Sequence, residues 1–214
     1  EIFQKLQSFS DYKDATIFWM GETYFKGSDF AQARKYYQQL IDQYPKSTYL
    51  PQAYYSLGWS YFDQGDYEKA SSFFLKLITR FPDHELAEDT YFKYGECEYN
   101  LRHYEQAIQY FQRYLAKYPL SRQSADAYFY MAESYYYTND FLLAVTSYAK
   151  AADATTDPKI AVLSNISMGW SYLKLEKYEL AEKHFRIAEK SAKENGMTAD
   201  EVYLGLANLY GQMK

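Results

Sequence analysis

The sequence predicts an all-α solenoid of stacked helical hairpins, and three observations lead to that prediction. A step of 37 residues separates five alanines: Ala33, Ala70, Ala107, Ala144 and Ala181. The same step separates a second column of small residues: Gly21, Gly58, Gly95, Ala132 and Gly169. It also separates a column of large aromatic residues: Tyr37, Phe74, Phe111, Tyr148 and Phe185. A constant step of this size is typical of repeat proteins, in which each repeat packs mainly on its neighbours.

One repeat, residues 51–82, predicts two helices. In the first helix, apolar residues at i, i+3, i+4 and i+7 form one face: Tyr54, Leu57, Gly58 and Tyr61. Gly65 is expected to end this helix, and Asp66 to cap the next. The second helix presents Tyr67, Ala70, Phe74 and Leu77 on one face. It ends at Phe81, because the residue before Pro82 is disfavoured in the helical conformation.

The residues Tyr54-x-x-Leu57-Gly58-x-x-Tyr61, Gly65-Asp66-Tyr67-x-x-Ala70, Phe74, Leu77 and Pro82 resemble the tetratricopeptide repeat, TPR. The resemblance covers nearly the whole chain, with each linker three residues longer than in the usual unit of about 34 residues. It implies a right-handed superhelical solenoid in which residues 1–214 form a single array. Five full repeats are expected at 14–50, 51–87, 88–124, 125–161 and 162–197.

Both ends of the chain are expected to lie inside repeats. Residues 1–13, with Ile2 to Phe9 as a helix, resemble the end of a preceding repeat, and 198–214 resemble the first helix of a further one. The capping box Thr198-Ala-Asp-Glu201 is expected to start that last helix. Its packing stripe is expected to be Tyr203, Leu206, Ala207 and Tyr210. The chain is therefore expected to be a fragment of a longer protein.

The linkers carry a narrower resemblance. Tyr44-Pro45-Lys46-Ser47 and Tyr118-Pro119-Leu120-Ser121 each lead through a long linker into the next first helix. These segments resemble bacterial cell-envelope TPR proteins of the YbgF (Tol-Pal accessory) and BamD type. The resemblance implies a location in the periplasm or cell envelope of a bacterium, with a cytoplasmic location as the alternative.

Composition and motifs exclude several classes of function. The net charge of -5 argues against nucleic acid, because phosphate binding needs a basic surface. No apolar run has the length of a membrane span, and the lone Cys97 excludes an internal disulfide. His84, His103 and His184 are scattered without metal-ligand spacing, and no phosphate-binding loop is present. We therefore expect no catalytic residues, no metal and no cofactor.

The TPR resemblance implies that the first helix of each repeat lines a concave groove. Three columns on that face follow at spacings of four and three residues. From them, the candidate partner-binding residues are Phe18, Glu22, Phe25, Tyr55, Trp59, Phe62, Phe92, Glu96, Tyr99, Phe129, Glu133, Tyr136 and Trp170. The alternative for the aromatic columns is that they fill the seams between repeats.

The middle column of these candidates, Glu22, Trp59, Glu96, Glu133 and Trp170, is the most informative. Tryptophan is unusual at this polar position, and exposed tryptophans often anchor interfaces. The nearby acids Asp63, Asp89 and Asp126 make the groove acidic. The predicted partner is a protein or peptide with basic and apolar groups. An acidic C-terminal peptide is disfavoured, because the Lys/Asn/Arg clamp that such TPR proteins use is replaced here by aromatic and acidic residues.

The sequence therefore predicts a non-enzymatic protein-interaction scaffold. Three alternatives stay open: a self-assembling structural array, a carbohydrate- or peptidoglycan-binding module, and a regulatory arm of an enzyme. Two residues of the third repeat are expected to be structural. Glu98 replaces a tyrosine on the packing stripe, so it should lie in a wetter seam or have a partner. Cys97 belongs to a column of small residues and should be a packed, unreactive thiol.

Overall fold

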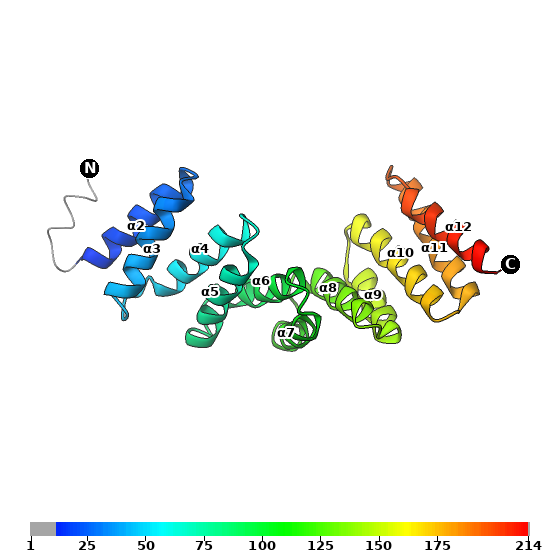
Figure 1. Ribbon diagram of the computed structural model, residues 1–214, viewed down its shortest axis with the longest axis horizontal. Coiled ribbons are helices and arrows are strands. Elements are labelled where there is room, and N and C mark those ends of the chain that lie inside the picture. Colours follow the sequence, from blue (N-terminus) through cyan, green and yellow to red (C-terminus); the bar gives the residue numbers. More distant parts are fainter. Residues whose placement is uncertain (1–11, 214) are drawn as a thin grey trace. The chain divides into compact units, whose positions relative to one another are not determined.

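The computed structural model describes residues 12–213, and this range contains eleven helices and no β-strand (Figure 1). In chain order they are α2 (Lys13–Lys26), α3 (Phe30–Gln43), α4 (Leu50–Phe62), α5 (Tyr67–Arg80), α6 (Ala87–Asn100), α7 (Tyr104–Lys117), α8 (Ser124–Tyr137), α9 (Phe141–Ala154), α10 (Pro158–Lys174), α11 (Tyr178–Glu194) and α12 (Asp200–Gln212). This confirms the all-α fold class. The helix expected at Ile2 to Phe9 lies outside the described residues.

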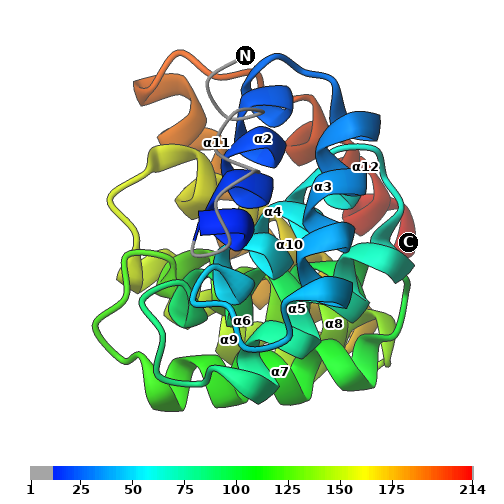
Figure 2. The same ribbon diagram turned by 90° about the vertical axis from the view of Figure 1, so that its left-hand side faces the viewer.

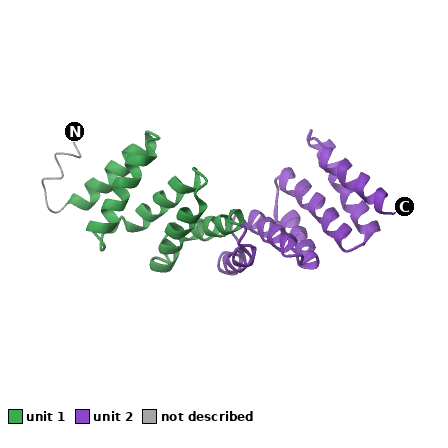
Figure 3. Cartoon of the chain, in the orientation of Figure 1, with its two compact units in different colours: residues 1–101 green, residues 102–214 purple. Residues whose placement is uncertain are grey.

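The chain divides into two compact units, residues 1–101 and 102–214 (Figure 3). The first unit contains α2 to α6, and each of these helices packs on the next. The pair α2 and α3 lies side by side in both views (Figure 1, Figure 2). In the second unit, α7 to α12 also pack consecutively, and α10 contacts α8 and α12 in addition. Each unit thus has the successive hairpin packing of a solenoid.

The small residues on the first helices allow a close approach of aromatic rings from the second helices. A Cβ atom added at Gly58 would lie 2.4 Å from Cε1 of Phe74, whose side chain is fully buried. Gly169 has the same relation to Phe185, with a distance of 2.6 Å. Because real Cβ atoms do not come this close to a neighbour, the ring occupies the space that a larger residue would need. The alanine column on the second helices is likewise fully buried in all five repeats.

Each hairpin turn holds one residue in the left-handed backbone conformation at the same position of the repeat. The φ angles are 61° at Ser28, 75° at Gly65, 62° at Arg102, 64° at Asn139 and 57° at Glu176. Residues other than glycine adopt this conformation at a cost of about 1–2 kcal/mol. The predicted helix-ending role of Gly65 is therefore confirmed. At the other four turns, a residue other than glycine adopts the same backbone conformation.

The ends of several helices follow the predicted signals. The carboxylate of Asp66 accepts a hydrogen bond of 3.2 Å from the backbone N–H of Lys69, so Asp66 caps α5 as expected. Helix α5 ends at Arg80, with Phe81 as the capping residue before the proline. Helix α10 begins at Pro158, earlier than the first helix expected from Val162. Proline suits the first position of a helix, and Asp157 caps this helix.

The last helix differs from its prediction in two respects. Its capping residue is Ala199, which provides no side-chain hydrogen bond, so the predicted capping box is wrong. Its buried residues are Val202, Gly205, Leu206 and Leu209, whereas three of the predicted stripe, Tyr203, Ala207 and Tyr210, are exposed. The physical reason is Gly205, where an added Cβ would lie 2.4 Å from Cε1 of Phe185. The contact with this ring selects Gly205 as the small residue of α12, in place of Ala207.

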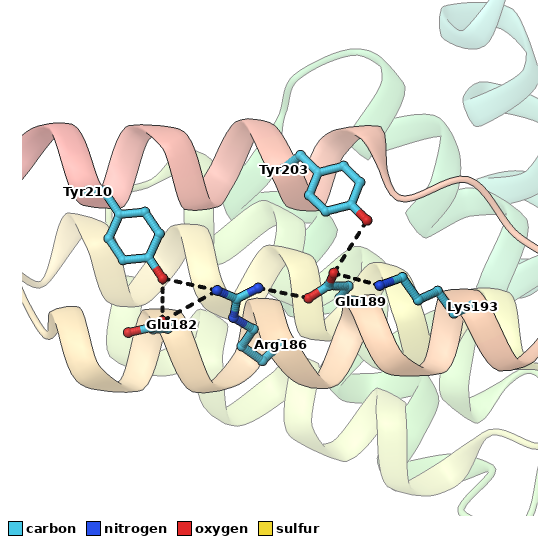
Figure 4. A network of polar contacts seen from close by, with 6 residues as sticks. All are labelled: Glu182, Arg186, Glu189, Lys193, Tyr203 and Tyr210. Carbon is cyan, nitrogen blue, oxygen red and sulfur yellow. Dashed lines mark hydrogen bonds and ion pairs between the residues drawn. The ribbon is translucent and has the colours of Figure 1, made fainter.

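The two exposed tyrosines of α12 join a polar network on α11 (Figure 4). The hydroxyl of Tyr210 donates to Glu182 and accepts a hydrogen bond of 3.2 Å from Arg186. The carboxylate of Glu189 pairs with Arg186 and Lys193, each at 2.9 Å, and accepts from Tyr203 at 3.3 Å. This network links α12 to α11 outside the apolar core.

The two unusual residues of the third repeat are both buried. Glu98 is 5% exposed and accepts a hydrogen bond from the hydroxyl of Ser71, so it has a partner and does not lie in a wetter seam. Cys97 is fully buried, and this burial raises the pKa of its thiol, with Glu96 and Glu98 acting in the same direction. A thiol that stays protonated and buried is unreactive, as predicted.

Candidate partner-binding grooves

The first column of candidate residues lies mostly in the seams. Phe18 and Phe92 are each 5% exposed, and Phe18 stacks on Tyr49 with ring centroids 4.8 Å apart. Tyr55 and Phe129 are partly buried, and Phe129 packs edge-on against Tyr148. These aromatic side chains therefore pack mainly between helices and present little area of their own to a partner, although Phe18 and Tyr55 also line a groove.

In the first unit, five candidate residues line one groove of 490 Å³, which we call the first groove. Its lining residues are Phe18, Glu22, Phe25, Gln52, Tyr55, Ser56, Trp59, Asp63 and Leu86. Trp59 packs edge-on against Tyr55 and Phe62, with centroid distances of 6.1 and 5.6 Å. The hydroxyl of Tyr55 donates a hydrogen bond of 2.7 Å to Asp89, which fixes the ring. The first groove therefore combines rigid aromatic walls with the carboxylates of Glu22 and Asp63.

In the second unit, three candidates line a groove of 270 Å³, which we call the second groove. Its lining residues are Glu133, Tyr136, Tyr137, Tyr148, Ser167 and Trp170. Trp170 is partly buried and packs edge-on against Phe185 at 5.6 Å, so one side of the indole belongs to the core. Burial raises the pKa of the Tyr136 hydroxyl, and the neighbouring charge of Glu133 adds to the effect. The second groove is therefore a smaller aromatic site around one carboxylate.

The carboxylate in the first groove is held by two neutral donors. The hydroxyl of Tyr37 donates to Oε1 of Glu22 at 2.6 Å, and the hydroxyl of Ser56 donates to the same oxygen at 3.1 Å. Burial raises the pKa of Tyr37 well above its usual range, and the hydrogen bond to Glu22 adds to the shift. The phenol therefore stays protonated and remains a donor at physiological pH. The bonds come from α3 and α4, so the packing of three helices orients Glu22.

The second groove repeats this arrangement. Tyr148 and Ser167 both donate to Oε1 of Glu133, the serine at 3.3 Å. Each residue lies 111 residues, or three repeats, after its counterpart, and the pairs are Glu22 with Glu133, Tyr37 with Tyr148, Ser56 with Ser167, and Trp59 with Trp170. The sequence contains a signal for this, because Ser-Leu-Gly-Trp-Ser-Tyr at 56–61 recurs as Ser-Met-Gly-Trp-Ser-Tyr at 167–172. Tyr37 and Ser56 were not predicted as site residues, although this recurrence could have pointed to them.

Candidates of the second and third repeats meet at a lysine, Lys93 on α6, that was likewise not predicted. The ammonium of Lys93 pairs with Glu96 at 2.8 Å. It lies 4.6 Å from the ring centroid of Trp59 and 4.9 Å from that of Phe62. Both charged side chains are only 14% exposed. The remaining candidate of the third repeat, Tyr99, is partly buried on α6, and Asp126 is partly buried on α8.

Two observations bear on other functions. Among residues 12–213, no group of three or more His, Cys, Asp and Glu residues is placed to hold a metal ion. Within the same range, no helix combines the length and the apolar character needed to cross a membrane.

Three solved structures share the fold of this chain. A crystal structure of MamA has a TM-score of 0.74 at 20% identity, over 87% of this chain and 95% of that one. YrrB, described as a TPR protein with an unusual peptide-binding site, has a TM-score of 0.73 at 18% identity, over 89% and 92%. BtubC from P. vanneervenii has a TM-score of 0.68 at 19% identity, over 92% and 88%. At these identities the likeness establishes the fold alone.

Comparison of sequences identifies the repeats. No curated protein matches the chain. The narrower resemblance to YbgF and BamD is not shown by any of these comparisons and stays a prediction. Two family models, both described as tetratricopeptide repeat, match residues 20–85 and 89–121. Together with the helical hairpins and the solved neighbours, these matches show that the chain belongs to the tetratricopeptide-repeat proteins.

Proposed function

We propose that the protein is a non-enzymatic interaction scaffold that holds a partner segment with basic and apolar groups in its acidic, aromatic grooves. The observation that carries this proposal is the composition of the first groove. Aromatic side chains from α2 and α4 surround the carboxylate of Glu22, and Asp63 adds a second negative charge. Apolar walls around a fixed charge are what a peptide-binding site needs for affinity and orientation.

The aromatic rings favour a cation as well as apolar side chains. A cation over the face of a tryptophan or tyrosine is stabilised by about 0.5–2 kcal/mol, depending on how far it is desolvated. Lys93 already illustrates this contact in the chain, where its ammonium lies over Trp59 and Phe62. A basic side chain of a partner would meet a carboxylate and an aromatic wall in the first groove, where Phe25 and Tyr55 line the surface beside the Trp59 ring that Lys93 already contacts.

The comparisons support an interaction role at the level of the fold. Stacked helical repeats usually present an extended surface to a partner. YrrB, which has the same fold, is described as having a peptide-binding site. We extend that kind of function, and none of its details, to the present chain.

We place the scaffold in a bacterial cell-envelope assembly. This part of the proposal rests on the linkers, whose Tyr-Pro-Lys-Ser and Tyr-Pro-Leu-Ser segments resemble those of envelope TPR proteins. Fractionation of the source cell with an antibody against this chain tests it. Recovery with the periplasmic or membrane fraction is expected, and recovery with the cytosol alone would contradict the location and leave the groove proposal intact.

A peptide-display selection tests the binding function. Random peptides are selected on the full chain and then measured against three variants: Trp59→Ala, Trp170→Ala and the control Trp19→Ala. Trp19 is 43% exposed and lines neither groove, so its variant controls for the loss of a tryptophan elsewhere. We expect peptides rich in lysine, arginine and apolar residues, with binding weakened by changes at Trp59 or Trp170 and kept with Trp19→Ala.

Two controls make the outcome decisive. Far-UV circular dichroism of each variant checks that the helices are intact, since both groove tryptophans also pack on neighbouring rings. Equal binding by all three variants would place the interface outside the grooves. Binding of soluble peptidoglycan fragments, with no peptide selected, would favour the carbohydrate alternative and contradict the proposal.

A further inference from the structure

We infer that the two grooves are two copies of one site for a lysine or arginine side chain of a partner, one copy in each unit. The inference rests on the proposed function, because it names the chemical group that the grooves receive. It goes further by assigning the recognition to Glu22 and Glu133 and by giving the array two equivalent sites.

The first step is that the side chains around Glu22 and around Glu133 have the same arrangement. In both units a carboxylate on a first helix accepts hydrogen bonds, at one oxygen, from a tyrosine on the second helix and a serine on the next first helix. A tryptophan one turn after that serine lines each groove. The combination of glutamate and tyrosine is specific to repeats one and four. Repeats two and five have tryptophan with phenylalanine at the corresponding positions, as Trp59 with Phe74 and Trp170 with Phe185.

The second step is the charge of the ligand. The donors that hold Glu22 are hydroxyl groups, which orient the carboxylate without neutralising it. The described residues that line the first groove contain two carboxylates and no lysine or arginine, and the Lys93 ammonium that lies over Trp59 is already paired with Glu96. A cation complements this surface, whereas an acidic segment would be repelled by it.

The third step is an acceptor in the first groove without a donor. Oε1 of Gln52 is buried and has no hydrogen-bond donor among residues 12–213. An ammonium or guanidinium group carries several N–H donors, so a rotation of the Gln52 side chain into the groove would let one basic side chain bound there provide a donor for this amide. The residue of the second unit that corresponds to Gln52 is Leu163, which has no hydrogen-bonding side chain and is not among the residues that line the second groove. The first groove is therefore expected to bind the cation more tightly than the second.

The fourth step is a precedent inside the chain. Glu96 belongs to the same column as Glu22 and Glu133, and it pairs with Lys93 while the ammonium lies over Trp59. The column carboxylate and the aromatic wall thus already hold one ammonium in the third repeat. We assign the same combination in the first and fourth repeats to a basic side chain of the partner.

Two equivalent sites have a measurable consequence. A partner with one basic anchor binds either groove weakly. A partner with two anchors on a linker that reaches both grooves binds about 10²–10⁴ times more tightly, because the second contact forms within the complex. This advantage is absent when the linker is too short to reach both sites.

Fluorine NMR of the full chain labelled with 5-fluorotryptophan tests the inference. The chain has 3 tryptophans, so each signal reports one location: Trp59 the first groove, Trp170 the second, and Trp19 a surface outside both. The probe is a short peptide with one central lysine between leucines. Matched peptides carry arginine or acetyl-lysine at the same place. We expect the lysine and arginine peptides to shift Trp59 and Trp170, Trp59 at the lower concentration, and the acetyl-lysine peptide to shift neither.

Isosteric variants assign the two sites separately. Glu22→Gln removes the charge and keeps an acceptor for Tyr37, so it should weaken the response of Trp59 about tenfold or more and leave that of Trp170 unchanged. Glu133→Gln should do the reverse. The control variants are Glu68→Gln and Glu179→Gln, which change two exposed glutamates that also lie 111 residues apart. Gln52→Leu, which copies Leu163, should remove the difference in affinity between the grooves.

The outcomes separate this inference from the proposed function. Equal binding of the acetyl-lysine peptide, or a response at one tryptophan alone, would overturn the inference and keep the grooves as peptide sites. Loss of both responses in Glu22→Gln would also overturn it, because the two sites would not be independent. If neither these peptides nor those selected by display shift Trp59 or Trp170, the proposed function fails as well.

Discussion

The hydrogen bond between Tyr37 and Glu22 gives a prediction in which charge can be separated from packing. Phenylalanine replaces this tyrosine in repeats two, three and five, as Phe74, Phe111 and Phe185, and all three rings are fully buried. Tyr37→Phe should therefore keep the ring packing and remove only the hydroxyl. The change isolates one hydrogen bond of 2.6 Å.

The magnitude follows from the surroundings of the bond. Tyr37 is fully buried, and a hydrogen bond to a charged group contributes about 1.5–3 kcal/mol. Glu22 is partly exposed in the groove and keeps the bond from Ser56, so we expect a loss near the lower end, about 1.5 kcal/mol. In a Glu22→Gln background the acceptor is neutral, and the same loss of the hydroxyl should cost only about 0.5–1 kcal/mol.

Urea unfolding followed by far-UV circular dichroism measures the four proteins of this double-mutant cycle. Amide hydrogen exchange in α2 and α3 then shows that the loss is local to the first unit. Tyr148→Phe and Glu133→Gln form the matched cycle in the second unit. Equal costs of Tyr37→Phe in both backgrounds would refute the reasoning, because the charge of Glu22 would then not be what the hydroxyl stabilises.

Four other predictions concern the scaffold. Gly58→Ala should destabilise the first unit by about 1–3 kcal/mol, because the new Cβ would clash with the Phe74 ring. Gly211→Ala is the control, because no atom lies within 4 Å of its new Cβ, and it should be neutral or stabilising. Equal urea midpoints for the two variants would contradict the close approach of Gly58 and Phe74. Burial lowers the pKa of His184 below 6.5, so stability is complete above pH 6.5 and falls as the pH drops below it, because the unfolded chain binds the proton first. His184→Phe, which copies Phe73 stacked on Tyr61, should remove that pH dependence, and an unchanged pH profile would show that another group causes it. Hydrogen bonds from Lys193 and Arg186 lower the pKa of Glu189 to about 2. Acid should therefore weaken the contact of α12 with α11 only as the pH falls from 4.5 towards 2. Amide hydrogen exchange in α12 should become faster over that range. Cys97 should react with a thiol reagent only at the rate of unfolding, and fast labelling of the native chain would contradict its burial.

The fold could be predicted because its determinants repeat. The contact of Gly58 with Phe74 is local to one hairpin, and the same pairing of a small residue with an aromatic residue recurs along the sequence at a constant step. The prediction was wrong where the repetition ends. Gly205 and Ala207 are both small, and only the position of the Phe185 ring decides which of them faces the core. That position depends on how α12 crosses α11, which the local sequence does not encode.

The candidate site was predicted in part for a related reason. The column of Glu22, Trp59, Glu133 and Trp170 follows from helix periodicity, and all four residues line the grooves. The donors that hold the carboxylates come from other helices, at separations of 15 and 34 residues, so periodicity along one helix could not reveal them. Whether Phe18 and Phe92 face a partner or a seam likewise depends on the angles between helices, and the structure buries both.

The turn residues that adopt the left-handed backbone conformation have a consequence for which sequence changes the array can accept. Serine, arginine, asparagine and glutamate all occupy a backbone conformation that glycine adopts without cost. The packed helices, therefore, dictate the shape of the turn, and the turn residues follow. Evolution can then vary these loops freely, and an engineer could use them to graft an epitope or a fluorophore, while the grooves formed by the first helices keep their geometry.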